Sequence, residues 1–237
     1  MKIFDAKKIH TPLRVYPLFC SIYTGAVITL LAFAGRLSYF NFPLIGKIYI
    51  GVDFYLVPVL FYFQNVITEV YGYERCRQLN QISIVGMIFF MGYSYLTTLM
   101  PLPEQIANQD AFNMVASTYP RHFIAFIFAL YSGAIVNQYI IAKLKLRWNG
   151  KQLWLRSIIS VFTGDFVYQI IGSLISRFGV LHMSEIFTYD LLSYFYKLSF
   201  ELSSVPIVYI LSNYLKNLEE IDIYDNNANF NPFKIKL

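Results

Sequence analysis

The chain has 237 residues, of which 14% are charged and 57% are apolar, and its mean hydropathy is +0.48. A typical soluble chain carries roughly 25% charged residues, so this chain has too few charges to cover a globular surface in water. The composition excludes a disordered chain and argues against a soluble enzyme. The net charge of +5 does not predict nucleic-acid binding, because in a membrane protein the distribution of Lys and Arg matters more than their sum.

Six apolar stretches are long enough to predict membrane-spanning helices, which need about 20 residues each. They cover residues 17–33, 48–70, 83–100, 123–144, 158–175 and 194–214. The predicted fold class is therefore an all-α integral membrane protein with six transmembrane helices in a single domain over residues 1–237. The segment after about residue 217 turns acidic and rich in Asn, and is predicted to be a short disordered tail.

The distribution of Lys and Arg predicts the orientation of these helices. The N-terminal segment, the second and fourth loops and the tail together carry 14 basic residues, whereas the alternate loops carry Arg36, Lys47, Arg121 and Arg177. This asymmetry predicts a multi-pass protein of the bacterial inner membrane with both termini in the cytoplasm. An alternative is a signal peptide cleaved near Ala32-Phe33-Ala34, although the first apolar run is longer than signal peptides usually have.

The polar residues of the second predicted span share one helical face, which contains Tyr62, Asn65, Glu69 and Gly72. A carboxylate on such a face can accept two parallel hydrogen bonds from a flat N–H edge of a ligand. The alternative is that Glu69 lies at the cytoplasmic interface and pairs with Arg75 or Arg77.

The fifth predicted span places Asp165, Tyr168 and Gln169 on one face. Asp165 lies near mid-span, where a carboxyl group needs a partner or a proton, so it is a candidate for function. Ser160 and Gly164 form a small-x-x-x-small pattern, which indicates close packing against another helix.

The sixth predicted span contains Lys197 and Glu201, four residues apart. The simplest interpretation is an internal ion pair that lets both charges enter the membrane, and the alternative adds a ligand or a proton to that pair.

Motifs for catalysis are missing from the sequence. It has no P-loop, H-E-x-x-H or G-x-S-x-G motif, and its two cysteines and three histidines are scattered. We therefore expect no enzymatic activity, no cofactor and no metal site, and an intramembrane hydrolase is disfavoured.

Four segments in order resemble the queuosine precursor transporter family, also called the vitamin uptake transporter family. They are Ile67-Thr68-Glu69-Val70-Tyr71-Gly72 followed by Arg75 and Arg77; Pro120-Arg121; Leu153-Trp154-Leu155-Arg156-Ser157 leading to Ser160; and Tyr196-Lys197 with Pro206. The resemblance implies a six-helix fold similar to the substrate-binding components of energy-coupling-factor transporters. It also implies import of 7-deazaguanine precursors of queuosine without a dedicated ATPase.

The residues that carry over from the family by position are Glu69, Arg121, Arg156 and Lys197. The chain departs from the family pattern at Asn65, where an Asp is usual, and at Tyr168-Gln169, which align with an Asp-Thr pair.

The expected function is import of a 7-deazaguanine-type base, such as the 7-cyano or 7-aminomethyl compound or queuine. The predicted substrate-binding residues are Tyr62, Asn65, Glu69, Asp165, Tyr168, Gln169, Lys197 and Glu201. Asn65 and Glu69 would bind the guanine-like edge, and Tyr168 or Tyr62 would stack on the ring. The expected partners are this small molecule and membrane lipid, with a homo-oligomer left open and no nucleic acid. The alternatives are a vitamin-binding component of an energy-coupling-factor transporter and a non-transporting membrane scaffold.

Overall fold

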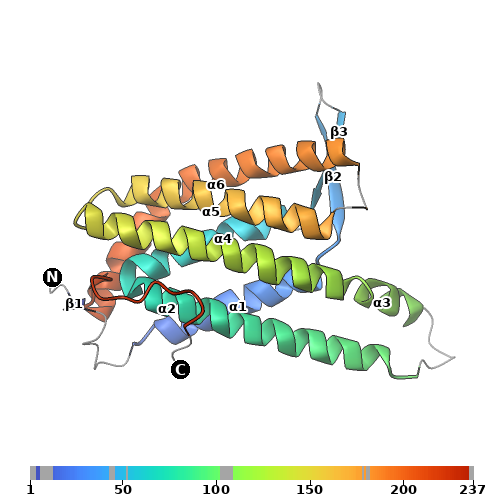
Figure 1. Ribbon diagram of the computed structural model, residues 1–237, viewed down its shortest axis with the longest axis horizontal. Coiled ribbons are helices and arrows are strands. Elements are labelled where there is room, and N and C mark those ends of the chain that lie inside the picture. The colour runs from blue at the N-terminus through green and yellow to red at the C-terminus, as the bar shows by residue number, and fades with distance from the viewer. Residues whose placement is uncertain are drawn as a thin grey trace.

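The computed structural model describes residues 4–5, 13–42, 46–51, 53–101, 109–177, 179 and 182–234. These residues form a helical bundle (Figure 1). Its helices are α1 (Tyr16–Ala32), α2 (Asp53–Thr98), α3 (Gln109–Ala116), α4 (Tyr119–Arg147), α5 (Leu153–Ser176) and α6 (Met183–Glu219). Its strands are β1 (Phe4–Asp5), β2 (Leu37–Phe42), β3 (Gly46–Gly51) and β4 (Ile223–Tyr224).

The strands mark the two ends of the bundle. β2 and β3 form an antiparallel hairpin with Leu37 opposite Gly51, whereas β1 and β4 pair in parallel and join the two ends of the chain. We call these the hairpin end and the tail end of the bundle; they lie at opposite sides of Figure 1.

Helix α2 consists of two arms that meet at Gly72 at the tail end. Gly72 has φ +81° and ψ 173°, which is not helical, so residues 53–71 and 73–98 form separate helical arms. The first arm leads away from the hairpin, and the second returns along the bundle (Figure 1). The single long helix therefore supplies two of the segments that the sequence predicts as spans.

The surface of the bundle is apolar, as a membrane protein requires. Three helical stretches are long and apolar enough to cross a membrane, over Tyr55–Thr98, Asp110–Arg147 and Leu153–Ser176, and α1 is a shorter apolar helix. Many large apolar side chains lie on the outside, and the most exposed include Val85, Phe89, Met114, Phe187 and Ile210, which are 66–77% exposed. Such a surface is stable against lipid and unstable against water, so the protein is an all-α membrane protein.

The sequence placed the start of the second span wrongly. Residues 48–51 belong to β3, and the helix begins only at Asp53. A short apolar run does not distinguish a strand from a helix by its periodicity, which is why neither the hairpin nor α3 was predicted.

Helices α4 and α5 approach each other closely through two glycines. A Cβ atom on Gly164 would lie 2.8 Å from both the Gly133 carbonyl oxygen and the Asn137 Cβ, and a Cβ atom on Gly133 would lie 2.8 Å from the Gly164 carbonyl oxygen. The packing role predicted for Gly164 is confirmed. This contact fixes the polar face of α5 relative to α4.

The tail after residue 217 is folded, contrary to the prediction of disorder. Ile221, Asp222, Ile223 and Asp225 are each 4% exposed or less. Both carboxylate oxygens of Asp225 accept a hydrogen bond from the Tyr73 backbone N–H, at 3.0 and 3.1 Å. This segment lacks the apolar content of a core, but its acidic residues find buried donors at the tail end, which local composition does not reveal.

More distant parts of the tail are also attached to the bundle. Arg77 donates to the backbone oxygens of Asn229 and Asn231 at 2.8 Å each, and Tyr131 donates to the Pro232 oxygen at 2.7 Å. The tail therefore crosses the bend of α2 and reaches α4.

We expect Gly164→Ala to lower the free energy of unfolding by about 1–3 kcal/mol, because the added methyl group must separate α4 from α5. Thermal unfolding in detergent measures this loss. Gly25→Ala on α1 is the matched control, since a Cβ atom there meets nothing within 4 Å. Equal melting temperatures for the two variants would contradict the close contact.

We expect Asp225→Ala to destabilise the protein by roughly 1–3 kcal/mol, because the buried Tyr73 N–H loses its acceptor. The exposed neighbour Asn226→Ala is the control. Limited proteolysis should cut the tail faster in the Asp225 variant, and equal cutting rates would show that Asp225 does not hold the tail.

Candidate functional site

A cavity of about 420 Å³ opens at the hairpin end of the bundle, within the size range of small-molecule sites. Its walls come from the C-terminal end of α1, the first turns of α4 and the last turns of α5. Leu30, Ala125, Phe126 and Ala129 supply apolar surface. The cavity therefore offers a mostly apolar space with polar groups on a few sides.

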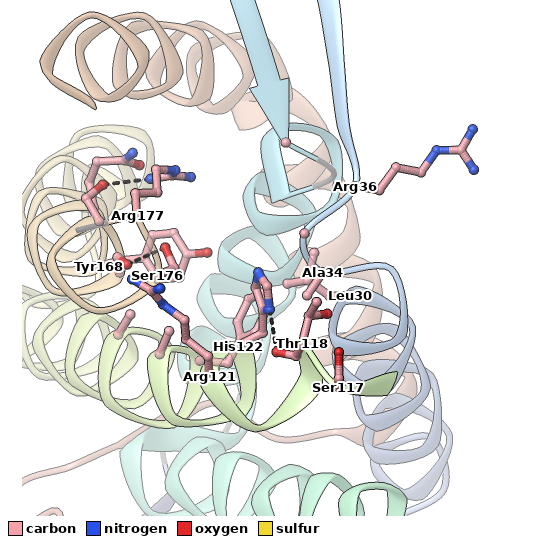
Figure 2. A pocket seen from close by; sticks show the side chains of 18 residues that line it. Leu30, Ala34, Arg36, Ser117, Thr118, Arg121, His122, Tyr168, Ser176 and Arg177 are labelled. Atoms are coloured by element: carbon pink, nitrogen blue, oxygen red, sulfur yellow. Dashed lines mark hydrogen bonds between the residues drawn. The ribbon is translucent and has the colours of Figure 1, made fainter. Parts of the chain in front are cut away.

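The α4 wall of the cavity carries Arg121 and His122 (Figure 2). Arg121 Nε donates to the Ile175 carbonyl oxygen at 3.0 Å, which ties this guanidinium to the end of α5. His122 Nδ1 lies 2.8 Å from the Thr118 carbonyl oxygen; because the carbonyl can only accept, Nδ1 carries the hydrogen. Arg36 points away from the other labelled side chains in Figure 2.

The α5 wall is held by an ion pair with α6. Arg177 Nη1 donates to Asp190 Oδ1 at 3.1 Å and to Ser173 Oγ at 2.7 Å, and its guanidinium stacks 3.7 Å from the centroid of the Tyr189 ring. Asp190 also accepts from Gln169 Nε2 at 2.7 Å. These bonds join the mouth of the cavity to its deeper part.

Tyr168 and Gln169 line the deeper part of the cavity. Lys197 of α6 lies directly behind them: its ammonium donates to Gln169 Oε1 at 2.6 Å and lies 4.5 Å from the centroid of the Tyr168 ring. Lys197 also forms an ion pair with Asp165 at 3.2 Å. The expectation that Asp165 needs a partner in mid-span is confirmed.

The predicted ion pair between Lys197 and Glu201 is wrong, because Lys197 pairs across to α5 instead. Glu201 Oε1 accepts hydrogen bonds from Asn65 Nδ2 at 2.9 Å and from Ser157 Oγ at 2.7 Å. Glu201 therefore lies in a separate buried cluster, one helical turn from Lys197 and farther from the cavity.

Glu69 lies in a buried ion network toward the tail end. Its carboxylate meets Arg156 Nη1 at 2.7 Å and Lys216 Nζ at 2.6 Å, and Lys145 Nζ lies 3.7 Å away. Asp222 of the tail pairs with Lys145 at 2.6 Å and with Lys216 at 3.0 Å. The network thus joins α2, α4, α5, α6 and the tail.

The alternative interpretation of Glu69, pairing with Arg75 or Arg77, named the wrong partners. Arg77 binds backbone oxygens of the tail, and Arg75 donates to Gln78. The partners of Glu69 come from three other helices, a choice that neighbouring sequence does not reveal.

Of the eight predicted substrate-binding residues, the structure places Tyr168 and Gln169 on the cavity wall. Asp165 and Lys197 lie directly behind that wall, Asn65 and Glu201 lie deeper, and Glu69 lies near the tail end. Tyr62 is only partly buried and packs edge-on against Phe63. The eight residues therefore follow the interior of the bundle rather than forming one pocket.

Sequence reasoning missed His122, Ser173 and Arg177 as lining residues. His122 and Arg177 both flank predicted spans: Arg177 entered the prediction only as a basic residue that indicates orientation, and His122 only as one of three scattered histidines. Ser173 continues the face of Asp165, Tyr168 and Gln169, so helical periodicity could have identified it.

The chain matches a known protein family. The family described as "Putative vitamin uptake transporter" matches residues 53–211, about two thirds of the chain. The matched region begins with α2 and includes all eight predicted residues. No curated protein and no solved structure matches the chain.

We expect Glu69→Gln to lower the free energy of unfolding by about 3–5 kcal/mol, because Arg156 and Lys216 then lose a buried counter-charge. The exposed Glu220→Gln is the matched control. Thermal unfolding distinguishes a structural role of Glu69, as a buried counter-charge, from a role in ligand binding. An unchanged melting temperature with lost ligand binding would indicate direct contact with the ligand instead.

Proposed function

Because the chain belongs to the vitamin uptake transporter family, we propose that it imports a precursor of queuosine, a 7-deazaguanine-type base, for use in tRNA modification. The observation that carries the proposal is the cavity at the hairpin end, which is bordered by the matched family region and by α1. Its size suits a small molecule rather than a macromolecule.

The side chains around the cavity suit a flat heterocycle. Tyr168 and Phe126 offer aromatic surface for stacking. A guanidinium such as that of Arg121 is a good donor to the keto oxygen of a guanine-type base. The amide of Gln169, fixed by Lys197 and Asp190, presents a donor and an acceptor in a defined orientation.

The orientation of the helices in the membrane that we propose follows from the unequal distribution of Lys and Arg between alternate loops. Six spans, formed by α1, the two arms of α2, α4, α5 and α6, cross the bacterial inner membrane as one transmembrane domain, with both termini in the cytoplasm. In this arrangement the cavity opens away from the cytoplasm, and the Glu69 network lies on the cytoplasmic side, where it blocks the path of the base. The described conformation is then outward-facing.

The proposed substrate is tested in cells that cannot make queuosine. Expression of the protein with supplied 7-cyano-7-deazaguanine, 7-aminomethyl-7-deazaguanine or queuine should restore queuosine in tRNA, measured by mass spectrometry of tRNA digests. Failure with every one of these bases would reject the substrate.

The proposed site is tested with Arg121→Gln, which we expect to weaken binding of the imported base on the order of ten-fold, as loss of a base-edge contact does. Arg147→Gln is the control, because it removes another exposed Arg, at the opposite end of α4. Ligand-dependent thermal shifts of the purified variants measure the difference. Equal shifts for both variants would place the site elsewhere.

A second candidate, the vitamin-binding component of an energy-coupling-factor transporter, is favoured by the vitamin uptake described for the family. It requires a separate ATPase module. Uptake in a host that lacks this module supports the queuosine-precursor importer, and uptake that depends on the module supports the second candidate.

A further inference from the structure

Glu201 is an acidic residue that the bundle buries without a counter-charge. It is 0% exposed, and no ion pair involves it among the residues that the structure describes. Its Oε1 accepts two hydrogen bonds, from Asn65 and Ser157, whereas its Oε2 has no hydrogen-bond partner. The two oxygens of this carboxyl group are therefore in unlike surroundings.

The charged groups near Glu201 are engaged elsewhere. On α6, Lys197 one turn away binds Asp165 and Gln169. On α5, Arg156 precedes Ser157 but directs its guanidinium to Glu69 and to backbone oxygens.

The first arm of α2 faces Glu201 with the neutral amide of Asn65. The titratable groups nearest to Asn65 on that face are Tyr62, a turn before it, and Glu69, a turn after it. Glu69 holds its own three cations, and a second carboxylate would in any case disfavour a negative charge on Glu201.

An ionised carboxylate in this position would cost several kcal/mol, because the side chain is shielded from bulk water and forms no ion pair with the residues that the structure describes. The carboxylic acid form avoids that cost. In that form Oε1 is the carbonyl oxygen and accepts from both donors, and Oε2 carries the hydrogen. The unequal hydrogen bonding of the two oxygens matches the acid.

We propose that Glu201 is a proton-binding site that couples transport to a proton gradient. The proton adds to the carboxylate from water on the hairpin side and leaves to water on the tail side, so one proton crosses with each transport cycle. The coupling rests on the proposed transport function, whereas the bound proton does not.

The contacts between Glu201 and the cavity suggest how the two communicate. Gln169 lines the cavity and accepts from Lys197, which lies four residues before Glu201 on α6. A ligand that takes over the hydrogen bonds of Gln169 leaves Lys197 with Asp165 as its partner and so changes the surroundings of Lys197, one turn from Glu201. Asp165 keeps Lys197 away from Glu201 while the base and the proton are carried together, because an ammonium group beside the carboxyl would favour its ionised form and release the proton.

The bound proton is tested on purified protein without any substrate. Infrared spectra at neutral pH should contain the carbonyl stretch of a protonated carboxylic acid, and Glu201→Gln should remove it. Glu220→Gln, at an exposed site, should leave the band unchanged. Glu201→Gln replaces the acid by a neutral group of the same shape, so its melting temperature should stay close to that of the unmodified protein.

Two results would overturn the assignment of the proton. One is a band that persists in Glu201→Gln or is missing from the unmodified protein. The other is a melting temperature of Glu201→Gln that falls as far as that of Glu69→Gln, which would indicate an ionised Glu201.

The coupling is tested by uptake of 7-cyano-7-deazaguanine into proteoliposomes. With one proton per cycle, an outside pH lower by one unit should drive about ten-fold accumulation. Glu201→Gln should still bind the base but should lose this accumulation. Accumulation driven by a sodium gradient, or unchanged in the variant, would overturn the coupling. If the unmodified protein takes up no base under any gradient, the substrate proposal fails and the infrared result still decides whether Glu201 holds a proton.

Discussion

Asp165 and Lys197 form an ion pair between α5 and α6, and their side chains are 3% and 1% exposed. A charge inside an apolar bundle is costly unless another charge or a set of hydrogen bonds compensates it, and in this protein the compensating group usually comes from a different helix. Glu69 follows the same rule with cations from α4, α5 and α6. Breaking one helix away from its neighbours would expose several charges to an apolar environment, so these pairs specify how the helices are rotated as well as which of them meet.

The polar residues of α5 and α6 form a continuous interior band along the bundle. From the cavity toward the tail end it contains the Asp190–Arg177 pair, the Asp165–Lys197 pair, the Glu201 cluster and the Glu69 network. The close contact of Gly133 with Gly164 holds α4 against one side of α5, and the first arm of α2 supplies Asn65 and Glu69. Each level of this band is closed by ion pairs or hydrogen bonds between side chains of different helices.

Helical periodicity and the membrane cost of charge predicted much of this interior. Asn65, Glu69, Asp165, Gln169, Lys197 and Glu201 are all buried, as their positions on apolar helices indicated. Their partners were harder to predict, because pairing between helices depends on rotations and tilts that one sequence does not specify. The spacing of Lys197 and Glu201 suggested a pair within α6, but the structure prefers an interhelical contact for Lys197, which agrees with the unfavourable order of these charges along the helix. The hairpin and the folded tail were not predicted for a related reason. They are stabilised by contacts with residues distant in the sequence, and local composition does not reveal such contacts.

The folded tail also bears on how the bundle can assemble. Asp222 follows α6 in the chain, yet it balances Lys145 and Lys216, and Glu219 accepts hydrogen bonds from the backbone N–H groups of Arg14 and Val15 at the start of α1. If the helices packed before the tail docked, Lys145, Arg156 and Lys216 would surround the single carboxylate of Glu69. Docking of the tail and closing of the bundle at this end are therefore coupled, because the charges there balance only when both have happened.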